Sequence, residues 1–396
     1  MELKKQTNFD NTRSLVVKSM KPLLCIEYCY GIFRCGLTEG CSYALDLRMK
    51  ILGIAITMIW VTVYFGSIAF PFERDEQILR LEDKIIFMLI GFSYASSSIV
   101  FVLFHNHKYQ KAIEILAGVD IALFANIDRK VYKMSFRQCK ILFALFIFHC
   151  IIWLVLSKYC TEGFYSYEYL LFILINFERK IEMLVFCQFL YILKQRLLLI
   201  KNYLNIISFH RNYDNFTVNI KNRIDFNFIG HISSTNYKIR DLAHVYTKIG
   251  KIFMLINEIF NYYIMTTLAT AFITIIIVVW SLLNEYKFYK TYIIESIPTV
   301  FYIFLELSSI ILLSCYCENI IAARNELNKL LLNITTQENL PLQMIYQSNM
   351  FVKLTEIWHL SINGFHMFDI NLQLILKFIS ICTSYLIVVI QVYRLI

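Results

Sequence analysis

Hydrophobic residues in this chain gather in long runs that are separated by polar stretches. A helix that crosses a bilayer needs about 20 mostly apolar residues, and seven stretches of the 396-residue chain come close to or exceed that length. The predicted spans are 51–72, 85–107, 141–157, 165–193, 259–284, 296–317 and 371–393. A soluble fold of this size does not need seven segments that are apolar on all sides. The pattern therefore predicts an all-α integral membrane protein with seven transmembrane helices.

Composition agrees with this prediction. Hydrophobic residues make up 58% of the chain and charged residues 17%, against about 45–50% and about 25% in soluble domains. The low counts of Gly (11) and Pro (4) exclude collagen-like and disordered chains. Eleven cysteines are too dilute for a disulfide scaffold.

The distribution of Lys and Arg predicts the orientation, because cytosolic loops carry an excess of both residues. With a cytosolic N-terminus and an extracellular C-terminus, the cytosolic segments hold 26 of the 38 basic residues and the outer segments hold five. These cytosolic segments are 1–50, 105–137, 194–250 and 318–370. The net charge of +9 then needs no nucleic-acid partner, since the basic residues are dispersed along loops. The polar residues 1–24 do not resemble a cleaved signal peptide.

The cytosolic segments have helical patterns of their own. Residues 318–334 repeat apolar side chains at three- and four-residue steps, and residues 194–208 continue the fourth span in the same way. We predict a cytosolic N-terminal segment (1–50), six spans with their loops (51–317), cytosolic anchor helices (318–370) and a last span (371–396). The sequons at Asn215 and Asn333 fall on the cytosolic side in this topology, so neither is expected to carry glycan.

The last span carries a polar stripe. On a helical wheel, five of its polar side chains fall within about 60° of one another, and they are Gln373, Lys377, Ser380, Ser384 and Gln391. Such a stripe must face protein or water. Either several copies of the chain place it around a pore, or it forms hydrogen bonds with another helix of the same subunit. Ile387 and Val388 interrupt the stripe, and an apolar neck in a pore is suited to gating by dewetting.

The fourth span contains a charged cluster formed by Glu178, Arg179, Lys180 and Glu182. Arg179 and Glu182 are three residues apart and are able to pair. Charge inside a bilayer must be paired or hydrated, so the cluster indicates either a water-filled ligand pocket or an internal ion-pair network. The same two interpretations hold for Glu306 in the sixth span. Our candidate pocket residues are Arg179, Glu182, Glu306 and the aromatic residues Trp153, Tyr169 and Tyr302.

No motif of an enzyme, metal site or cofactor site is present. The sequence has no His-Glu-x-x-His, no Gly-Lys-Ser/Thr phosphate loop and no Gly-x-Ser-x-Gly. The cysteines near the N-terminus match no common zinc spacing. We therefore expect no catalysis, no metal and no cofactor.

The last span resembles the signature of insect gustatory receptors, which end with Thr-Tyr, five hydrophobic residues and Gln-Phe. Tyr385, the apolar spacer and Gln391 match, whereas Ser384 replaces Thr and Val392 replaces Phe. Upstream, Asp369 in Phe-Asp and Lys377 also resemble the family. The layout of about 400 residues, seven spans and inverted topology is similar over the whole chain.

This resemblance implies a tetrameric ligand-gated cation channel in the plasma membrane of sensory neurons. It implies that the last helix of each subunit lines the pore and that Gln391 and Val392 form the constriction. A small-molecule tastant would bind a separate outer pocket, and other gustatory receptor subunits would complete a homo- or hetero-tetramer. Sugar-sensing members tend to carry Glu after the motif Tyr, where this chain has Leu386, so a bitter or other non-sugar tastant is expected. The alternatives are an accessory subunit that needs a co-receptor, or a secondary transporter, although no inverted repeat is visible.

Overall fold

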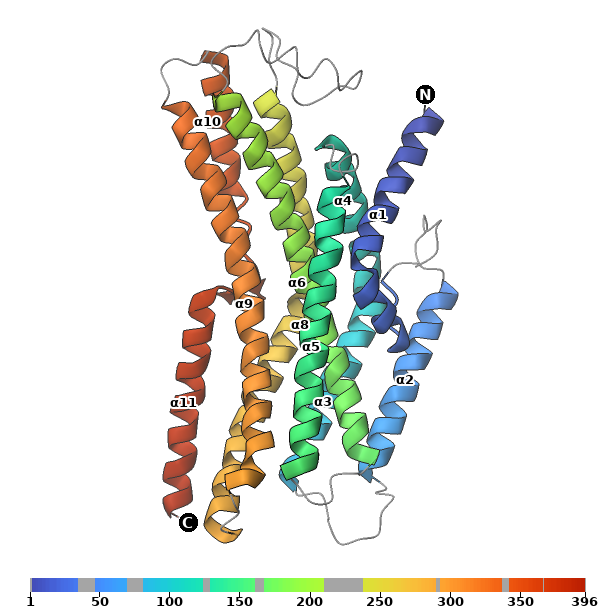
Figure 1. The fold of residues 1–396 in the computed structure, drawn as a ribbon, viewed down its shortest axis with the longest axis vertical. Coiled ribbons are helices and arrows are strands. Elements are labelled where there is room, and N and C mark those ends of the chain that lie inside the picture. Colours follow the sequence, from blue (N-terminus) through green and yellow to red (C-terminus); the bar gives the residue numbers. More distant parts are fainter. Residues whose placement is uncertain are drawn as a thin grey trace.

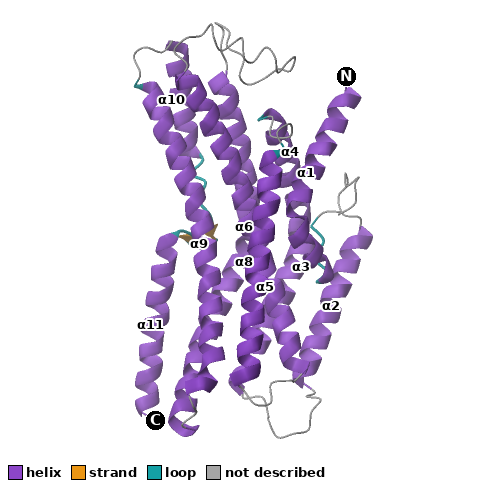
Figure 2. Cartoon of the chain, viewed as in Figure 1, coloured by secondary structure: helices purple, strands orange, loops and turns teal. Residues whose placement is uncertain are grey.

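The protein is described here by a computed structural model. The structure describes residues 2–34, 47–69, 81–123, 129–160, 167–209, 238–289, 293–336, 342–365 and 367–395. Nearly all of these residues are helical (Figure 2). In chain order the elements are α1 (Glu2–Cys29), α2 (Leu47–Ala69), α3 (Leu81–Val100), η1 (Phe101–His105), α4 (Asn106–Ala122), α5 (Lys130–Cys160), α6 (Tyr167–Phe209), α8 (Lys238–Tyr289), α9 (Ile293–Thr335), α10 (Leu342–Ile357), β1 (Asn363–Gly364), β2 (Phe368–Asp369) and α11 (Leu372–Leu395).

The prediction of seven spans is confirmed, because seven helical segments of the described chain are long and apolar enough to cross a membrane. The fourth span, which holds the charged cluster of residues 178–182, is the most enclosed of them. In its most apolar window 72% of the residues are buried, against 17% in the last span. Burial inside the protein explains how the fourth span tolerates charge that lipid would not accept.

Several spans extend beyond the length that a bilayer requires. The fourth span and the segment 194–208 form one helix, α6, and the sixth span runs on through 318–334 in α9, so both helical continuations are confirmed. The seventh span, α11, lies beside α9 in Figure 1, and the two ends of the chain lie at opposite ends of the molecule. The side of the membrane on which each extension lies stays a prediction.

The N-terminal segment is more structured than its polar sequence indicates. Helix α1 packs against α4, α5 and α6, and it buries Val16, Met20, Leu23 and Leu24 almost completely. The chain then turns at Gly31, whose φ of +85° is a backbone conformation that favours glycine. A Cβ at Gly31 would lie 2.6 Å from the carbonyl oxygen of Gly53 on α2. The absence of a side chain at both positions therefore allows the turn to lie directly on α2.

A buried ion pair joins α4 to α6, and a tyrosine connects α5 to the same carboxylate. Arg196 on α6 donates two hydrogen bonds to the carboxylate of Asp120 on α4, at 2.8 and 2.7 Å. Tyr132 on α5 donates to the same carboxylate at 2.5 Å. A carboxylate that accepts three hydrogen bonds keeps its buried charge well compensated.

Candidate functional site

Helix α11 has one face toward its own subunit and one face away from it. Leu374, Phe378 and Cys382 are buried where α11 packs against α8 and α9. All five residues of the polar stripe, Gln373, Lys377, Ser380, Ser384 and Gln391, are exposed. The Ser384 hydroxyl donates to the carbonyl oxygen of Ser380 on the same helix, at 2.9 Å. The interpretation that the stripe forms hydrogen bonds with another helix of the same subunit is therefore wrong for this structure.

The candidate gate residues lie on the exposed part of α11. Ile387 and Val388 are about half exposed, while the side chain of Val392 lies outside the described residues. Tyr385 of the motif places its ring edge-on against Phe272 of α8, with 5.4 Å between the ring centroids. The motif tyrosine thus links the last helix to α8, and the roles of the gate residues stay predictions.

A short hairpin holds the start of α11 against α8. Strands β1 and β2 pair in antiparallel fashion, with Asn363 opposite Asp369 (Figure 2). Asn257 of α8 donates its side-chain amide to the Asn363 side chain at 2.9 Å and accepts the backbone N–H of Asn363 at 3.2 Å. Asn261, one helical turn further, accepts the N–H of Phe365 at 2.7 Å. These hydrogen bonds connect α8 directly to the turn that precedes α11.

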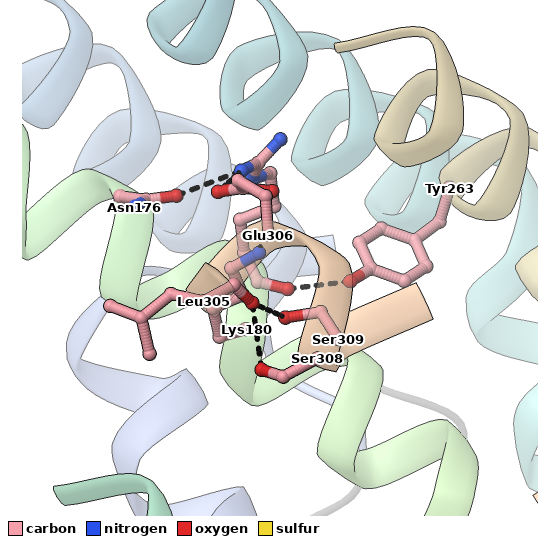
Figure 3. A network of polar contacts seen from close by, with 8 residues as sticks. Asn176, Lys180, Tyr263, Leu305, Glu306, Ser308 and Ser309 are labelled. Atoms are coloured by element: carbon pink, nitrogen blue, oxygen red, sulfur yellow. Dashed lines mark hydrogen bonds and ion pairs between the residues drawn. The ribbon is translucent and has the colours of Figure 1, made fainter. Parts of the chain in front are cut away.

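The charged cluster of the fourth span forms ion pairs with other helices. Arg179 donates to one oxygen of Glu306 on α9 at 2.6 Å, and Lys180 donates to the other oxygen at 2.8 Å. The Arg179 guanidinium also donates to Asn176 at 3.0 Å (Figure 3). The internal ion-pair network is therefore present, but the predicted pairing of Arg179 with Glu182 is wrong. Glu182 instead accepts from Arg34 at 3.2 Å.

Arg34 was not singled out by the sequence. It follows the turn at Gly31 and is fully buried, and it donates to Glu27 at 2.7 Å as well as to Glu182. Its guanidinium carbon lies 4.3 Å from the ring centroid of Phe101, a distance typical of a cation–π contact. Burial raises the pKa of the Glu27 carboxyl, although Arg34 opposes that shift. No local pattern in residues 1–50 marks Arg34, because both carboxylates are brought to it by the fold.

The structure also contains a cavity of about 210 Å³ between α5, α6 and α9. Its wall is mainly apolar, and the polar residues that line it are His149, Cys150, Asn176, Lys180, Ser308 and Ser309. Of the predicted pocket residues, Trp153 lines this cavity. Tyr302 packs against Trp153 with ring centroids 5.5 Å apart.

The remaining predicted pocket residues lie elsewhere. Arg179, Glu182 and Glu306 are buried in the ion pairs described above and do not line this cavity. The side chain of Tyr169 lies outside the described residues. Sequence reasoning missed the cavity because its walls come from three helices that are distant in the chain.

Comparison with known proteins agrees with this architecture. A family model described as 7tm Chemosensory receptor matches residues 22–393. The structure of the insect olfactory receptor OR5 from Machilis hrabei aligns over 95% of this chain and 97% of its own, with a TM-score of 0.62 and 14% sequence identity. The structure of the same receptor in complex with eugenol aligns over 94% and 97%, with a TM-score of 0.56 and 13% identity. No curated protein sequence matches the chain.

Proposed function

Because the chain belongs to the 7tm chemosensory receptor family, we propose that it is a gustatory receptor subunit of a ligand-gated, non-selective cation channel. The family is one of receptors and not of enzymes, and the seven spans make this chain a multi-pass membrane protein. The proposed location is the plasma membrane of sensory neurons.

The polar stripe on α11 carries the proposal. Its five side chains point away from their own subunit, and hydrocarbon is a poor solvent for them. Several copies arranged around one axis would give the stripe a shared aqueous surface. Ile387 and Val388 would form a neck that excludes water in the closed state, and separation of the helices would hydrate it. Four Gln391 amides would offer carbonyl oxygens to a passing cation.

A second exposed surface supports assembly of several subunits. Helix α10 is not among the candidate spans, yet Leu342, Tyr346, Met350 and Ile357 are all exposed. Their spacing places them on one helical face, and lipid does not explain an apolar face outside the spans. This face is suited to contact between anchor regions in a tetramer of identical or related subunits.

The cavity between α5, α6 and α9 is the proposed binding site for a small tastant. It combines an apolar wall with a few polar groups, as ligand sites usually do. The neighbouring ion pair between α6 and α9 would respond to a ligand that changes the spacing of these helices. Leu386 after the motif Tyr favours a bitter or other non-sugar tastant over a sugar.

Current recording with a tastant panel tests this function. The chain is expressed alone and then with candidate partner subunits. Current from the chain alone supports a self-sufficient channel, and current only with a partner indicates an accessory subunit. Substrate uptake without current would overturn the channel proposal in favour of a transporter. Gln391→Ala is expected to change ion selectivity or block, and unchanged permeation would remove Gln391 from the pore.

A further inference from the structure

The buried charge cluster presents a positive charge to the cavity. One carboxylate, Glu306, is shared between two cations, Arg179 and Lys180, at 2.6 and 2.8 Å. All three side chains are at most 5% exposed. The neighbouring Glu182 is bound to Arg34, and Glu178 lies about 200° around α6 from Lys180, on the opposite side from the cavity. None of the four buried carboxylates of the network, Glu27, Glu178, Glu182 and Glu306, lines the cavity, so the formal charge that its wall presents is positive.

Lys180 is the cation of this cluster that lines the cavity. Its ammonium group has three donor hydrogens, and one of them is directed to Glu306. Asn176 also lines the cavity, and its side-chain oxygen accepts from Arg179. Its amide N–H groups donate no hydrogen bond within the described part of the chain. Two donors, one of them charged, are available to a ligand at the base of the cavity.

The cavity opens sideways toward the bilayer. Leu145, which lines the cavity, is 53% exposed on a spanning helix, so this side chain faces lipid. The volume of about 210 Å³ is below the ~300–1,000 Å³ of sites that enclose a drug-sized ligand. A ligand with a long apolar tail would therefore place its head group inside the cavity and its tail beside Leu145, toward lipid.

We propose that this cavity binds the carboxylate of a small amphiphilic acid that reaches it through the bilayer. The carboxylate accepts hydrogen bonds from Lys180 and Asn176, and the apolar body lies against Leu142, Leu145 and Leu312. The added negative charge pairs with the Lys180 ammonium, which matters most in a site of low dielectric. An amine would be repelled by the Lys180 ammonium, and a neutral molecule would gain no ion pair with it.

The hydrogen bonds of Ser308 and Ser309 favour a small acid over a ligand that would need more hydrogen-bond donors from the cavity wall. Both hydroxyl groups donate to the carbonyl oxygen of Leu305, at 2.9 Å each (Figure 3). Their hydrogens are therefore engaged, and the donors left at the base of the cavity are those of Lys180 and Asn176. The meaning of such binding for taste rests on the proposed function, but the binding itself does not require a channel.

Thiol protection at Cys150, which lines the cavity, tests the inference directly. The full chain is placed in nanodiscs of phosphatidylcholine, and a lipophilic maleimide is added with octanoic acid or with methyl octanoate. Modification of Cys150 is followed by peptide mass spectrometry, with Cys150→Ser as the assignment control. Octanoate is expected to slow labelling about tenfold, and methyl octanoate at the same concentration less than twofold, because only the carboxylate gains a charge-assisted hydrogen bond from Lys180.

Variants at charged positions complete the test. Lys180→Met leaves one cation on one carboxylate and is expected to remove the protection by octanoate. Lys194→Met, on the same helix but bonded to Asn319 at an exposed position, is expected to keep it. If Lys180→Met does not fold, Lys180→Arg is expected to retain protection. Equal protection by acid and ester, or protection that survives Lys180→Met, overturns the inference and indicates an apolar occupant.

Binding and current are separable outcomes. Protection of Cys150 without tastant-evoked current in any subunit combination would leave the acid site standing and contradict the channel proposal. Current without protection by octanoate would leave the channel proposal standing and overturn the acid site.

Discussion

Tyr385 on α11 and Phe272 on α8 hold their rings edge to face, with centroids 5.4 Å apart and an angle of 86° between the ring planes. Such a pair contributes about 0.5–1.5 kcal/mol beyond burial. In the proposed channel, this pair links the pore helix α11 to α8, and α8 also forms hydrogen bonds with the hairpin that precedes α11. Tyr385→Ala is therefore expected to shift the half-maximal tastant concentration by up to about tenfold.

A double-mutant cycle measures this coupling. Tyr385→Ala and Phe272→Ala are expected to be non-additive, whereas Tyr385→Phe keeps the aromatic ring and should behave like the parent chain. Strict additivity of the two alanine substitutions would show that this ring contact plays no part in gating.

The exposure of the polar stripe predicts a pattern of chemical accessibility. Ser384→Cys places a thiol on the stripe, and a water-soluble thiol reagent is expected to block current when tastant is present. Ile379→Cys is the matched control, because Ile379 is also exposed on α11 but lies about 140° around the helix from Ser384. Its thiol would face lipid and stay unmodified. Equal block at both positions would contradict the proposed direction of the stripe.

The sequence was sufficient to predict features that depend on local pattern. Seven apolar runs predicted seven spans, and three- and four-residue spacing predicted the long extensions of α6 and α9. The stripe on α11 was also visible as a periodicity. Its direction was not, because only the packing of Leu374, Phe378 and Cys382 against other helices shows which face is free.

Features that depend on distant contacts were not predictable. Spacing alone indicated that Arg179 could pair with Glu182. Instead, Arg179 pairs with Glu306, which is 127 residues away in the sequence. Glu182 pairs with Arg34, which is 148 residues away. The burial of α1 was missed for the same reason, since a polar segment gives no hydrophobic signal strong enough to place it inside a bundle. The cavity between α5, α6 and α9 likewise exists only once the three helices meet.

The contact between Gly31 and Gly53 predicts a strong effect of one methyl group. A Cβ at Gly53 would lie 2.6 Å from the carbonyl oxygen of Gly31, and backbone cannot move aside as a flexible side chain does. Gly53→Ala is expected to lower stability by about 3 kcal/mol, at the upper end of overpacking effects. Gly118→Ala is the control, because a Cβ there meets nothing within 4 Å and should stabilise α4 by up to about 1 kcal/mol. Thermal unfolding in detergent, followed by size-exclusion chromatography, measures both.

The predicted orientation is testable through the two sequons. Asn333, which is exposed on α9, and Asn215, which lies outside the described residues, are both expected to stay unmodified in cells. Endoglycosidase treatment should therefore leave the electrophoretic mobility unchanged. A flexible, sequon-bearing extension after Ile396 is the positive control and should gain glycan, because the C-terminus is predicted to be extracellular. Glycan on the native sequons would invert the topology.

The shared carboxylate of Glu306 predicts a large loss of stability when its charge is removed. Glu306→Gln leaves Arg179 and Lys180 without a counter-charge in a buried site, and breaking a buried ion pair costs about 3–5 kcal/mol. Glu326→Gln is the control, because it removes the charge of an exposed ion pair with Lys201 that joins the same two helices. This substitution is expected to lower stability by less than about 1 kcal/mol. The difference in thermal midpoint between these variants, at equal lipid and detergent, measures the contribution of burial. Midpoints that fall by the same amount would mean that Glu306 is hydrated, and the cluster would then have to be treated as part of a water-filled pocket.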